Sequence, residues 1–262
     1  MIFQVGLQNK EMRKVKAVAI IPARLESSRL PNKALADILG LPMIVHVLKR
    51  CLLAKSLDSV YVATDSNKIK EVVEQYGGKV VMTSVKHQTG TDRVAEAAKD
   101  IKADIIVNVQ GDEALVNPEY IDKAVEGLVS SPSSDVSILV NPFNVKNSTS
   151  DIKVVLNKYD EVMYFSRADI PSDARVKDPK ILKAYHIVPF KKEFLLQYAK
   201  WEKTELEQIE FNEYLRILEN GYKIQAVRVE SDAISVDTQS DLDYVINKMK
   251  KDKLFNKYQS NT

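Results

Sequence analysis

Short apolar runs alternate with amphipathic stretches through the first half of the chain. The apolar runs are AVAII (17–21), SVYVAT (59–64), KVVMT (79–83) and DIIVNV (104–109), and helical periodicity fills 42–55, 67–76, 92–99 and 118–129. Continuous apolar runs, rather than alternating ones, are typical of strands that are buried on both faces. Strands that alternate with helices predict an α/β fold, with a mostly parallel sheet and helices on both of its faces.

The order of elements changes after about residue 132. The segments SDVSILVNPF, IKVVLNKYDEVMYFSRADIP and KAYHIVPF are expected to form consecutive strands, which predicts an antiparallel insertion at about 133–200. Further helices are predicted at 191–199, 205–220 and 239–250, with a strand near 223–229. We expect one domain over 16–250, preceded by an N-terminal extension (1–15) that contains a second methionine, Met12, and followed by a polar, frayed tail (251–262).

Composition and charge narrow the class of protein. The 262 residues are 45% hydrophobic and carry a formal net charge of +2, so no strong basic field indicates a nucleic-acid partner. We find neither a secretory signal pattern nor a run near the roughly 18 apolar residues of a membrane span. Cys51 is the single cysteine, so no internal disulfide can form, and the cytoplasm is the expected location.

Three cations follow the first predicted strand, in the loop IPARLESSRLPNKAL. Ligands of open α/β sheets bind outside the carboxyl ends of the strands, where Arg24, Arg29 and Lys33 are expected to lie. Arginine forks and a lysine point charge suit a polyphosphate better than a single carboxylate. The alternative is a solvated loop whose cations pair with nearby acids. The loop contains no glycine, so it is neither a P-loop nor a dinucleotide fingerprint.

Two aspartates are candidates for Mg²⁺ ligands. Asp112 follows an apolar strand in VNVQGDE, and Asp237 ends an apolar stretch in ISVDTQSDL. Mg²⁺ in proteins commonly uses one or two carboxylates together with substrate phosphates and water. The competing interpretation is that Asp237 and Thr238 only cap the last helix. Glu113, beside Asp112, is expected at the surface.

The segment HQTGTDR (87–93) could bring backbone groups against a flat base. Its alternative role is a loop with a helix N-cap. His46, His87 and His186 show no metal-ligand spacing, and His46 is expected to be structural.

These segments, taken together, resemble the 3-deoxy-manno-octulosonate cytidylyltransferases, or CMP-Kdo synthetases, over roughly 16–250. The diagnostic stretches are PARLESSRLPNK and VNVQGDE, accompanied in order by VATD, HQTGTDR, YFSRADIP and VDTQSDL. The resemblance implies a Rossmann-like nucleotidyltransferase fold, a homodimer formed by the insertion, and the reaction of CTP with a sugar acid to give a CMP-sugar and pyrophosphate.

The resemblance also implies a role for each matching residue. It assigns the triphosphate to Arg24, Arg29 and Lys33, and Mg²⁺ to Asp112 and Asp237. It assigns the rest of the nucleotide to Pro22, Ala23, Thr64, Asp65, His87, Thr89, Gly90, Thr91 and Gln110. It assigns the acceptor acid to Arg167, His186, Glu213 and Tyr214.

The acceptor segment departs from the family pattern. KAYHIVPFK (183–191) stands where the family usually has RHxGxYxYR, so Ala184 replaces a histidine and Val188 a tyrosine. Tyr214 stands in place of a glutamine. A site built around hydroxyl groups discriminates strongly when its polar partners change, which predicts poor turnover of ordinary octulosonate and better turnover of a modified ulosonic acid.

Two other functions remain open at this point. One is a nucleotidyltransferase for a sugar 1-phosphate, although the GxGTR loop typical of those enzymes is missing. The other is a non-catalytic nucleotide-binding homologue with a decayed sugar pocket.

Overall fold

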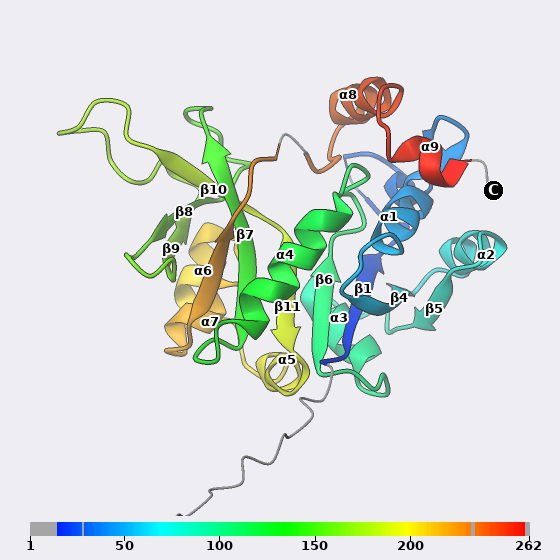
Figure 1. Cartoon of the computed structure of the whole chain (residues 1–262), viewed down its shortest axis with the longest axis horizontal. Helices are drawn as coiled ribbons and strands as arrows, with labels where there is room; N and C mark the ends of the chain where they lie inside the picture. Colours follow the sequence, from blue (N-terminus) through cyan, green and yellow to red (C-terminus); the bar gives the residue numbers. More distant parts are fainter. Residues whose placement is uncertain (1–14, 28, 232–233, 260–262) are drawn as a thin grey trace, which may run out of the picture.

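The computed structural model describes residues 15–27, 29–231 and 234–259 (Figure 1). Four parallel strands form one half of its large sheet, in the order β5 (Lys79–Met82), β4 (Leu57–Thr64), β1 (Ala17–Ala23) and β6 (Ile105–Val109). They coincide with the apolar runs in the sequence. All seven residues of β1 are buried, as expected for a central strand covered on both faces.

Helices cover both faces of this half of the sheet. Alternate residues of β1 point to opposite faces. Ala19 and Ile21 belong to the apolar cluster under α1 (Met43–Cys51), α2 (Asn67–Gln75) and α4 (Pro118–Val129). Val18 and Ile20 belong to the cluster under α3 (Gly90–Ala98) and α5 (Lys192–Tyr198). The predicted two-faced α/β arrangement is therefore confirmed.

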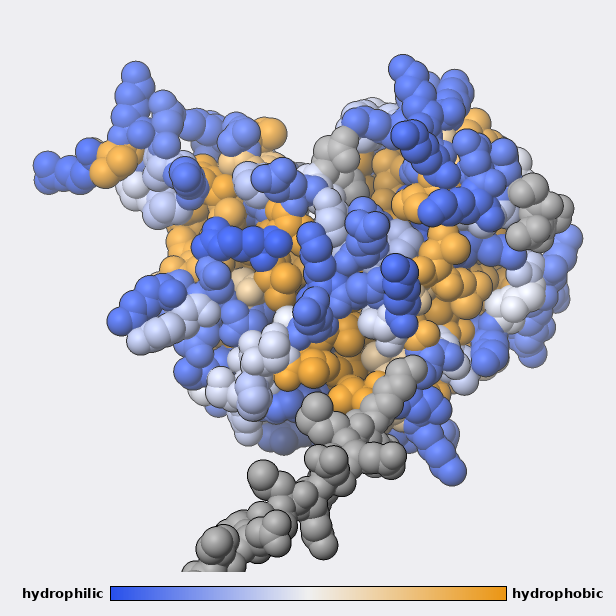
Figure 2. Space-filling model, in the orientation of Figure 1, coloured by the Kyte–Doolittle hydropathy of each residue, from blue (hydrophilic) through white to orange (hydrophobic). Residues whose placement is uncertain are grey.

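The other half of the sheet is mainly antiparallel, as predicted for the insertion. Beyond β6 come β11 (Ile187–Lys191), β7 (Val136–Phe143), β10 (Ile181–Tyr185), β8 (Lys153–Leu156) and β9 (Val162–Ser166), and β12 (Ile224–Arg228) pairs in parallel with β7. The loop between β9 and β10 projects at the upper left of Figure 2 and carries mostly hydrophilic side chains.

The segment KAYHIVPF is not one regular strand. β10 and β11 follow one another along β7, with His186 between them. Tyr185 pairs with Leu139, and Phe190 pairs with Val136. The chain therefore advances five residues while β7 advances three, and the extra residues form a bulge. Such bulges bend a strand and redirect side chains, and they occur frequently beside active sites.

The helix predicted over 205–220 is divided. α6 (Glu205–Glu210) begins at a capping box on Thr204 and ends at Phe211, whose φ of 52° lies in the left-handed region. The chain then turns into α7 (Leu215–Glu219). The left-handed position at a helix end usually holds glycine, so a phenylalanine there left no signal of this break in the sequence.

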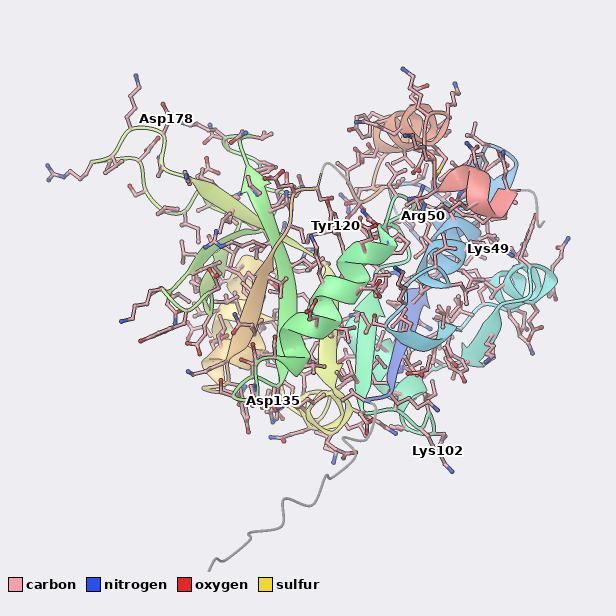
Figure 3. The ribbon with its side chains drawn as sticks, in the orientation of Figure 1. Lys49, Arg50, Lys102, Tyr120, Asp135 and Asp178 are labelled. Carbon is pink, nitrogen blue, oxygen red and sulfur yellow. The ribbon has the colours of Figure 1, made fainter. Side chains whose placement is uncertain are left out.

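The prediction that the tail (251–262) frays is wrong for residues 255–258, and residues 260–262 lie outside the described residues. After α8 (Gln239–Met249), the short helix α9 (Phe255–Tyr258) packs against α1. Arg50, which is labelled beside α1 in Figure 3, is 1% exposed and donates hydrogen bonds to Tyr258 Oη (3.2 Å) and the Val116 carbonyl oxygen (3.3 Å). His46 lies between Tyr258 Oη and the Ile38 carbonyl, each at 2.8 Å. His46 is therefore structural, as predicted.

The remaining short elements flank α1. They are η1 (Lys33–Leu35), β2 (Asp37–Ile38) and β3 (Leu41–Pro42). Cys51 is a buried free thiol. The predicted N-terminal extension (1–15) lies outside the described residues, except for residue 15. Within the described part of the chain, no helix has both the length and the apolar character needed to cross a membrane.

Candidate active site

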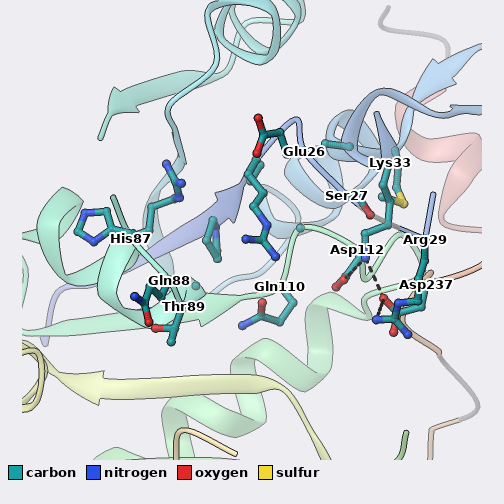
Figure 4. Close-up of a pocket in the computed structure, with 18 residues that line it drawn as sticks. Glu26, Ser27, Arg29, Lys33, His87, Gln88, Thr89, Gln110, Asp112 and Asp237 are labelled. Atoms are coloured by element: carbon teal, nitrogen blue, oxygen red, sulfur yellow. Dashed lines mark hydrogen bonds and ion pairs between the residues drawn. The ribbon is translucent and has the colours of Figure 1, made fainter. Parts of the chain in front are cut away.

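A cavity of about 330 Å³ opens where the carboxyl ends of β1 and β6 meet the N-terminus of α3. Figure 4 shows His87, Gln88 and Thr89 at one end of it, and the charged group Arg29, Lys33, Asp112 and Asp237 at the other. Gln110 lies between the two ends. The cavity is thus a polar trough at the edge of the sheet where α/β folds bind ligands.

Close backbone packing forms the floor of this trough. A Cβ atom placed on Gly111 would lie 2.7 Å from the Pro22 carbonyl oxygen, so the turn before Asp112 can press against β1 only with glycine at this position. On the opposite wall, a Cβ on Gly90 would come within 3.3 Å of the Pro22 ring. Pro22 is therefore the common neighbour of the loops after β6 and before α3.

Lys33 joins two aspartates that are far apart in the chain. Its Nζ atom donates to Asp112 Oδ2 at 2.7 Å and to Asp237 Oδ1 at 3.1 Å, while Arg29 forms an ion pair with Asp237 at 3.0 Å. Burial opposes the charge on Lys33, but the two carboxylates outweigh it and raise the pKa of this lysine. Both carboxylates therefore face one cationic position.

The helix-capping alternative does not account for Asp237. Thr238 is the N-cap of α8, and the reciprocal bonds of the capping box run between Thr238 and Asp241. The side chain of Asp237 instead faces Lys33 and Arg29. Across residues 15–27, 29–231 and 234–259, no group of three or more His, Cys, Asp or Glu side chains could hold a metal. A metal between Asp112 and Asp237 would thus need further oxygen ligands from substrate or water.

The loop at the other end of the trough is held from behind. Thr89 caps α3 by accepting a hydrogen bond from the Asp92 amide at 3.2 Å. His87 is bonded to Glu96, and Lys203 donates to Gln88 Oε1 at 2.7 Å. These contacts fix the loop while leaving His87, Gln88, Thr89 and Gly90 on the cavity wall.

Arg93 also lines the trough and was missed in the sequence. It is 4% exposed and donates to Thr83 Oγ1 at 2.6 Å and to Asp65 Oδ2 at 2.8 Å. Asp65 does not line the cavity itself, but it accepts a hydrogen bond from Arg93, which does. Arg93 stands next to Asp92 in HQTGTDR, but nothing in the sequence indicated that it turns inward.

Most residues assigned to the nucleotide and the metal do line this cavity. They are Pro22, Ala23, Arg24, Arg29, Lys33, His87, Thr89, Gly90, Gln110, Asp112 and Asp237. Thr64, Asp65 and Thr91 are not among the lining residues. Thr91 is fully buried and accepts a hydrogen bond from Asn108 Nδ2 at 3.0 Å, so it supports the wall.

A second cavity, of about 450 Å³, adjoins the first and shares Arg29 and Asp237 with it. Its wall includes Lys183, which donates to Asp151 Oδ1 at 2.7 Å, and His186. Burial lowers the pKa of His186 to about 4, so this imidazole is neutral near pH 7. Of the residues assigned to the acceptor, His186 is the one that lines this cavity.

The other three residues assigned to the acceptor support the wall in this structure. Arg167 donates to the backbone carbonyls of Glu210 (2.8 Å), Thr149 (2.6 Å) and Phe211 (3.1 Å). Glu213 accepts a hydrogen bond from Thr91 Oγ1 at 2.7 Å. Tyr214 is 2% exposed and stacks on His186, with ring centroids 5.8 Å apart. Their contacts with substrate stay predictions.

The expectation that Glu113 lies at the surface is wrong. Its side chain lines the second cavity and the residue is 2% exposed. One carboxylate oxygen accepts a hydrogen bond from Ser235 Oγ at 2.5 Å. Burial, reinforced by the charge of Asp112, raises the pKa of Glu113 to about 7.

Comparison with known proteins identifies the family. A family model described as cytidylyltransferase matches residues 18–224. The 3-deoxy-manno-octulosonate cytidylyltransferase of Geobacter metallireducens is 42% identical over 249 residues, covering 90% of this chain and 98% of the relative. That of Geotalea uraniireducens is 41% identical over 251 residues, covering 90% and 100%. The chain belongs to the 3-deoxy-manno-octulosonate cytidylyltransferase family.

A solved structure in this family shows the same fold. It is a CMP:2-keto-3-deoxy-manno-octonic acid synthetase complexed with CTP, with a TM-score of 0.87 and 36% sequence identity. The alignment covers 90% of this chain and 99% of that one. The predicted Rossmann-like nucleotidyltransferase fold is confirmed, and the chain is a CTP-dependent cytidylyltransferase.

Proposed function

We propose that this protein transfers CMP from CTP to the anomeric hydroxyl of a 3-deoxy-ulosonic acid of the manno-octulosonate type, releasing pyrophosphate. The observation that carries this function is the junction of two cavities at Arg29 and Asp237. One cavity offers cations and a loop suited to a nucleotide, and the other offers room for an acceptor. A donor and an acceptor bound there would meet beside Asp112 and Asp237.

The residues at the junction suit attack on a triphosphate. The acceptor hydroxyl oxygen forms a bond to the α-phosphorus and loses its proton, while the bond from that phosphorus to the pyrophosphate oxygen breaks. Positioning and charge neutralisation are the main contributions of a protein to such a transfer. Arg24, Arg29 and Lys33 can neutralise the departing pyrophosphate. The loop at 87–90 would hold the cytosine and so align the α-phosphate with the second cavity.

Asp112 and Asp237 are the residues we assign to Mg²⁺. Their carboxylates already converge on one ammonium group, and hard oxygen ligands are the ones that Mg²⁺ prefers. Bound there, the ion would supply Lewis-acid stabilisation of phosphate charge. Asp112→Asn and Asp237→Asn should each lower turnover about 100-fold or more while the fold persists, the scale of lost transition-state electrostatics. Full activity of either variant in Mg²⁺ would contradict the assignment.

We also propose a homodimer that works in the cytoplasm. In the described sheet β9 is the strand at the end of the order. Large apolar side chains near it are exposed: Met163 (62%), Ile209 (68%) and Phe211 (82%). Unpaired edges and apolar patches favour association between chains. Light scattering should report twice the mass of the chain, and Phe211→Glu with Met163→Glu should give monomers. A monomeric parent protein would contradict the dimer.

The decisive test of the proposed function combines nucleotide and acceptor selection. Thermal shifts with CTP, UTP, ATP and GTP should be largest with CTP, because a ligand that binds only the folded state stabilises it. Pyrophosphate release should then require CTP, Mg²⁺ and a 3-deoxy-ulosonic acid. Release with a sugar 1-phosphate instead, or binding of CTP without release for any acid, would favour the two alternative functions.

A further inference from the structure

The wall of the second cavity, where we place the acceptor, contains two buried polar side chains with no role so far. Glu113 comes from the turn after β6, and Tyr185 is the last residue of β10. Both line the cavity, and they are 2% and 3% exposed. Neither was among the residues that the sequence assigned to the acceptor.

Each of these side chains has one polar atom without a hydrogen-bond partner among the described residues. Ser235 Oγ occupies one carboxylate oxygen of Glu113 at 2.5 Å, while Oε2 is unpartnered. The hydroxyl oxygen of Tyr185 is unpartnered as well. Buried polar atoms are nearly always hydrogen-bonded, since leaving one unpaired costs stability. Two such atoms at one cavity therefore point to a polar group that completes them.

The neighbouring wall makes this assignment more specific. Ala184, which precedes Tyr185 in β10 and also lines this cavity, carries no polar side-chain atom. The ring of Tyr185 is fixed edge-on against Tyr120, with centroids 6.4 Å apart. Ser235 fixes the carboxyl group of Glu113 in the same way. Both polar atoms are thus held by rigid surroundings, which favours recognition of one group in one orientation.

We infer that Glu113 and Tyr185 form a specificity subsite for one hydroxyl group of the acceptor acid. The Tyr185 hydroxyl donates a hydrogen bond to the oxygen of that group, and the group donates its own proton to Glu113 Oε2. The subsite orients the acceptor so that its anomeric hydroxyl points toward the junction at Asp237. Neither residue touches the reacting atoms, so both are positioning residues. This inference rests on the proposed transfer of CMP to a sugar acid.

Tyr185→Phe tests the subsite because it removes one oxygen and keeps the ring. Steady-state kinetics should show a KM for the acceptor raised about tenfold or more, the effect of one lost hydrogen bond, with the KM for CTP unchanged. The unliganded melting temperature should stay the same or rise, because the lost hydroxyl has no partner to leave behind. Tyr258→Phe is the matched control: this tyrosine is also buried but lies against α1, and both KM values should persist.

Deoxy analogues of the acceptor identify the group that is held. Tyr185→Phe and Glu113→Gln should raise the KM of every acceptor except the analogue that lacks this hydroxyl. For that analogue, the wild-type protein and the variants should have the same KM. A lower melting temperature with unchanged acceptor KM would show a purely structural role and overturn the inference, as would equal penalties for all analogues. Failure of the proposed function has a different outcome, namely no transfer by the wild-type protein to any acid.

Discussion

Lys33→Met removes the ammonium group that holds Asp112 and Asp237 together. Nζ lies 2.7 Å and 3.1 Å from their carboxylate oxygens, and the lysine side chain is 17% exposed. Methionine keeps most of the aliphatic volume, so the change acts chiefly on charge. Exposed ion pairs contribute about 0–1 kcal/mol, and breaking fully buried ones costs roughly 3–5 kcal/mol. For this partly buried group we expect a loss of about 1–2 kcal/mol, or roughly 3–6 °C in melting temperature.

Magnesium should distinguish this explanation from a general packing defect. In EDTA the variant should melt below the wild-type protein, because the two carboxylates then repel each other without a counter-ion. Titration with MgCl₂ should stabilise the variant more than the wild type, since the divalent cation takes over the position of the ammonium group. Lys68→Met, at an exposed position of α2, is the control and should change neither value. Equal melting temperatures in EDTA, or equal responses to MgCl₂, would refute the reasoning.

Three further predictions follow from other parts of the molecule. Burial lowers the pKa of His46 from 6.5 to about 4, so its contribution to stability is complete above pH 6.5 and declines as the pH falls toward 4. The free energy of unfolding, measured in urea at several pH values, should therefore depend less on pH in His46→Gln than in the wild-type protein. Parallel curves for the two proteins would contradict this. Tyr214 is 2% exposed and packs in the same apolar cluster as Ala184 and Val188. All three should therefore be changed to the residues usual in the family at the same time. Ala184→His, Val188→Tyr and Tyr214→Gln combined should raise kcat/KM on ordinary octulosonate, whereas the first two alone should lower the melting temperature; a triple variant no better than wild type would refute altered specificity. Deleting residues 1–11 should leave activity and melting temperature nearly unchanged, and a loss of several degrees would contradict that.

The sequence predicted the parts of the site that follow from local pattern. Strands buried on both faces are visible as continuous apolar runs, and charged residues after them mark the ligand-binding edge of the sheet. This reasoning located Lys33 and Asp112 on neighbouring loops. Asp237 was also a candidate because it ends an apolar stretch, but its pairing with Lys33, 204 positions away, had no local signal.

What the sequence did not predict depends on contacts between distant segments. Glu113 is a charged residue type that is usually exposed, and its burial requires Ser235, which lies 122 positions away. The apolar side chains Phe255 and Tyr258 stand among lysines in a polar tail, so their packing against α1 had no local signal. The bulge at His186 arises from pairing with β7, and the residues of the segment themselves read as a plain strand.

The most direct test of the central claim follows the α-phosphate of CTP. CTP labelled at the α-phosphate, and separately at the γ-phosphate, is incubated with the protein, Mg²⁺ and 3-deoxy-ulosonic acids, and the products are separated. We predict that the α-label moves to a compound containing both cytidine and the sugar acid, while the γ-label appears in pyrophosphate. Transfer of the γ-label to the acceptor, or an α-label that stays in CTP or free CMP with every acid tested, would contradict the account.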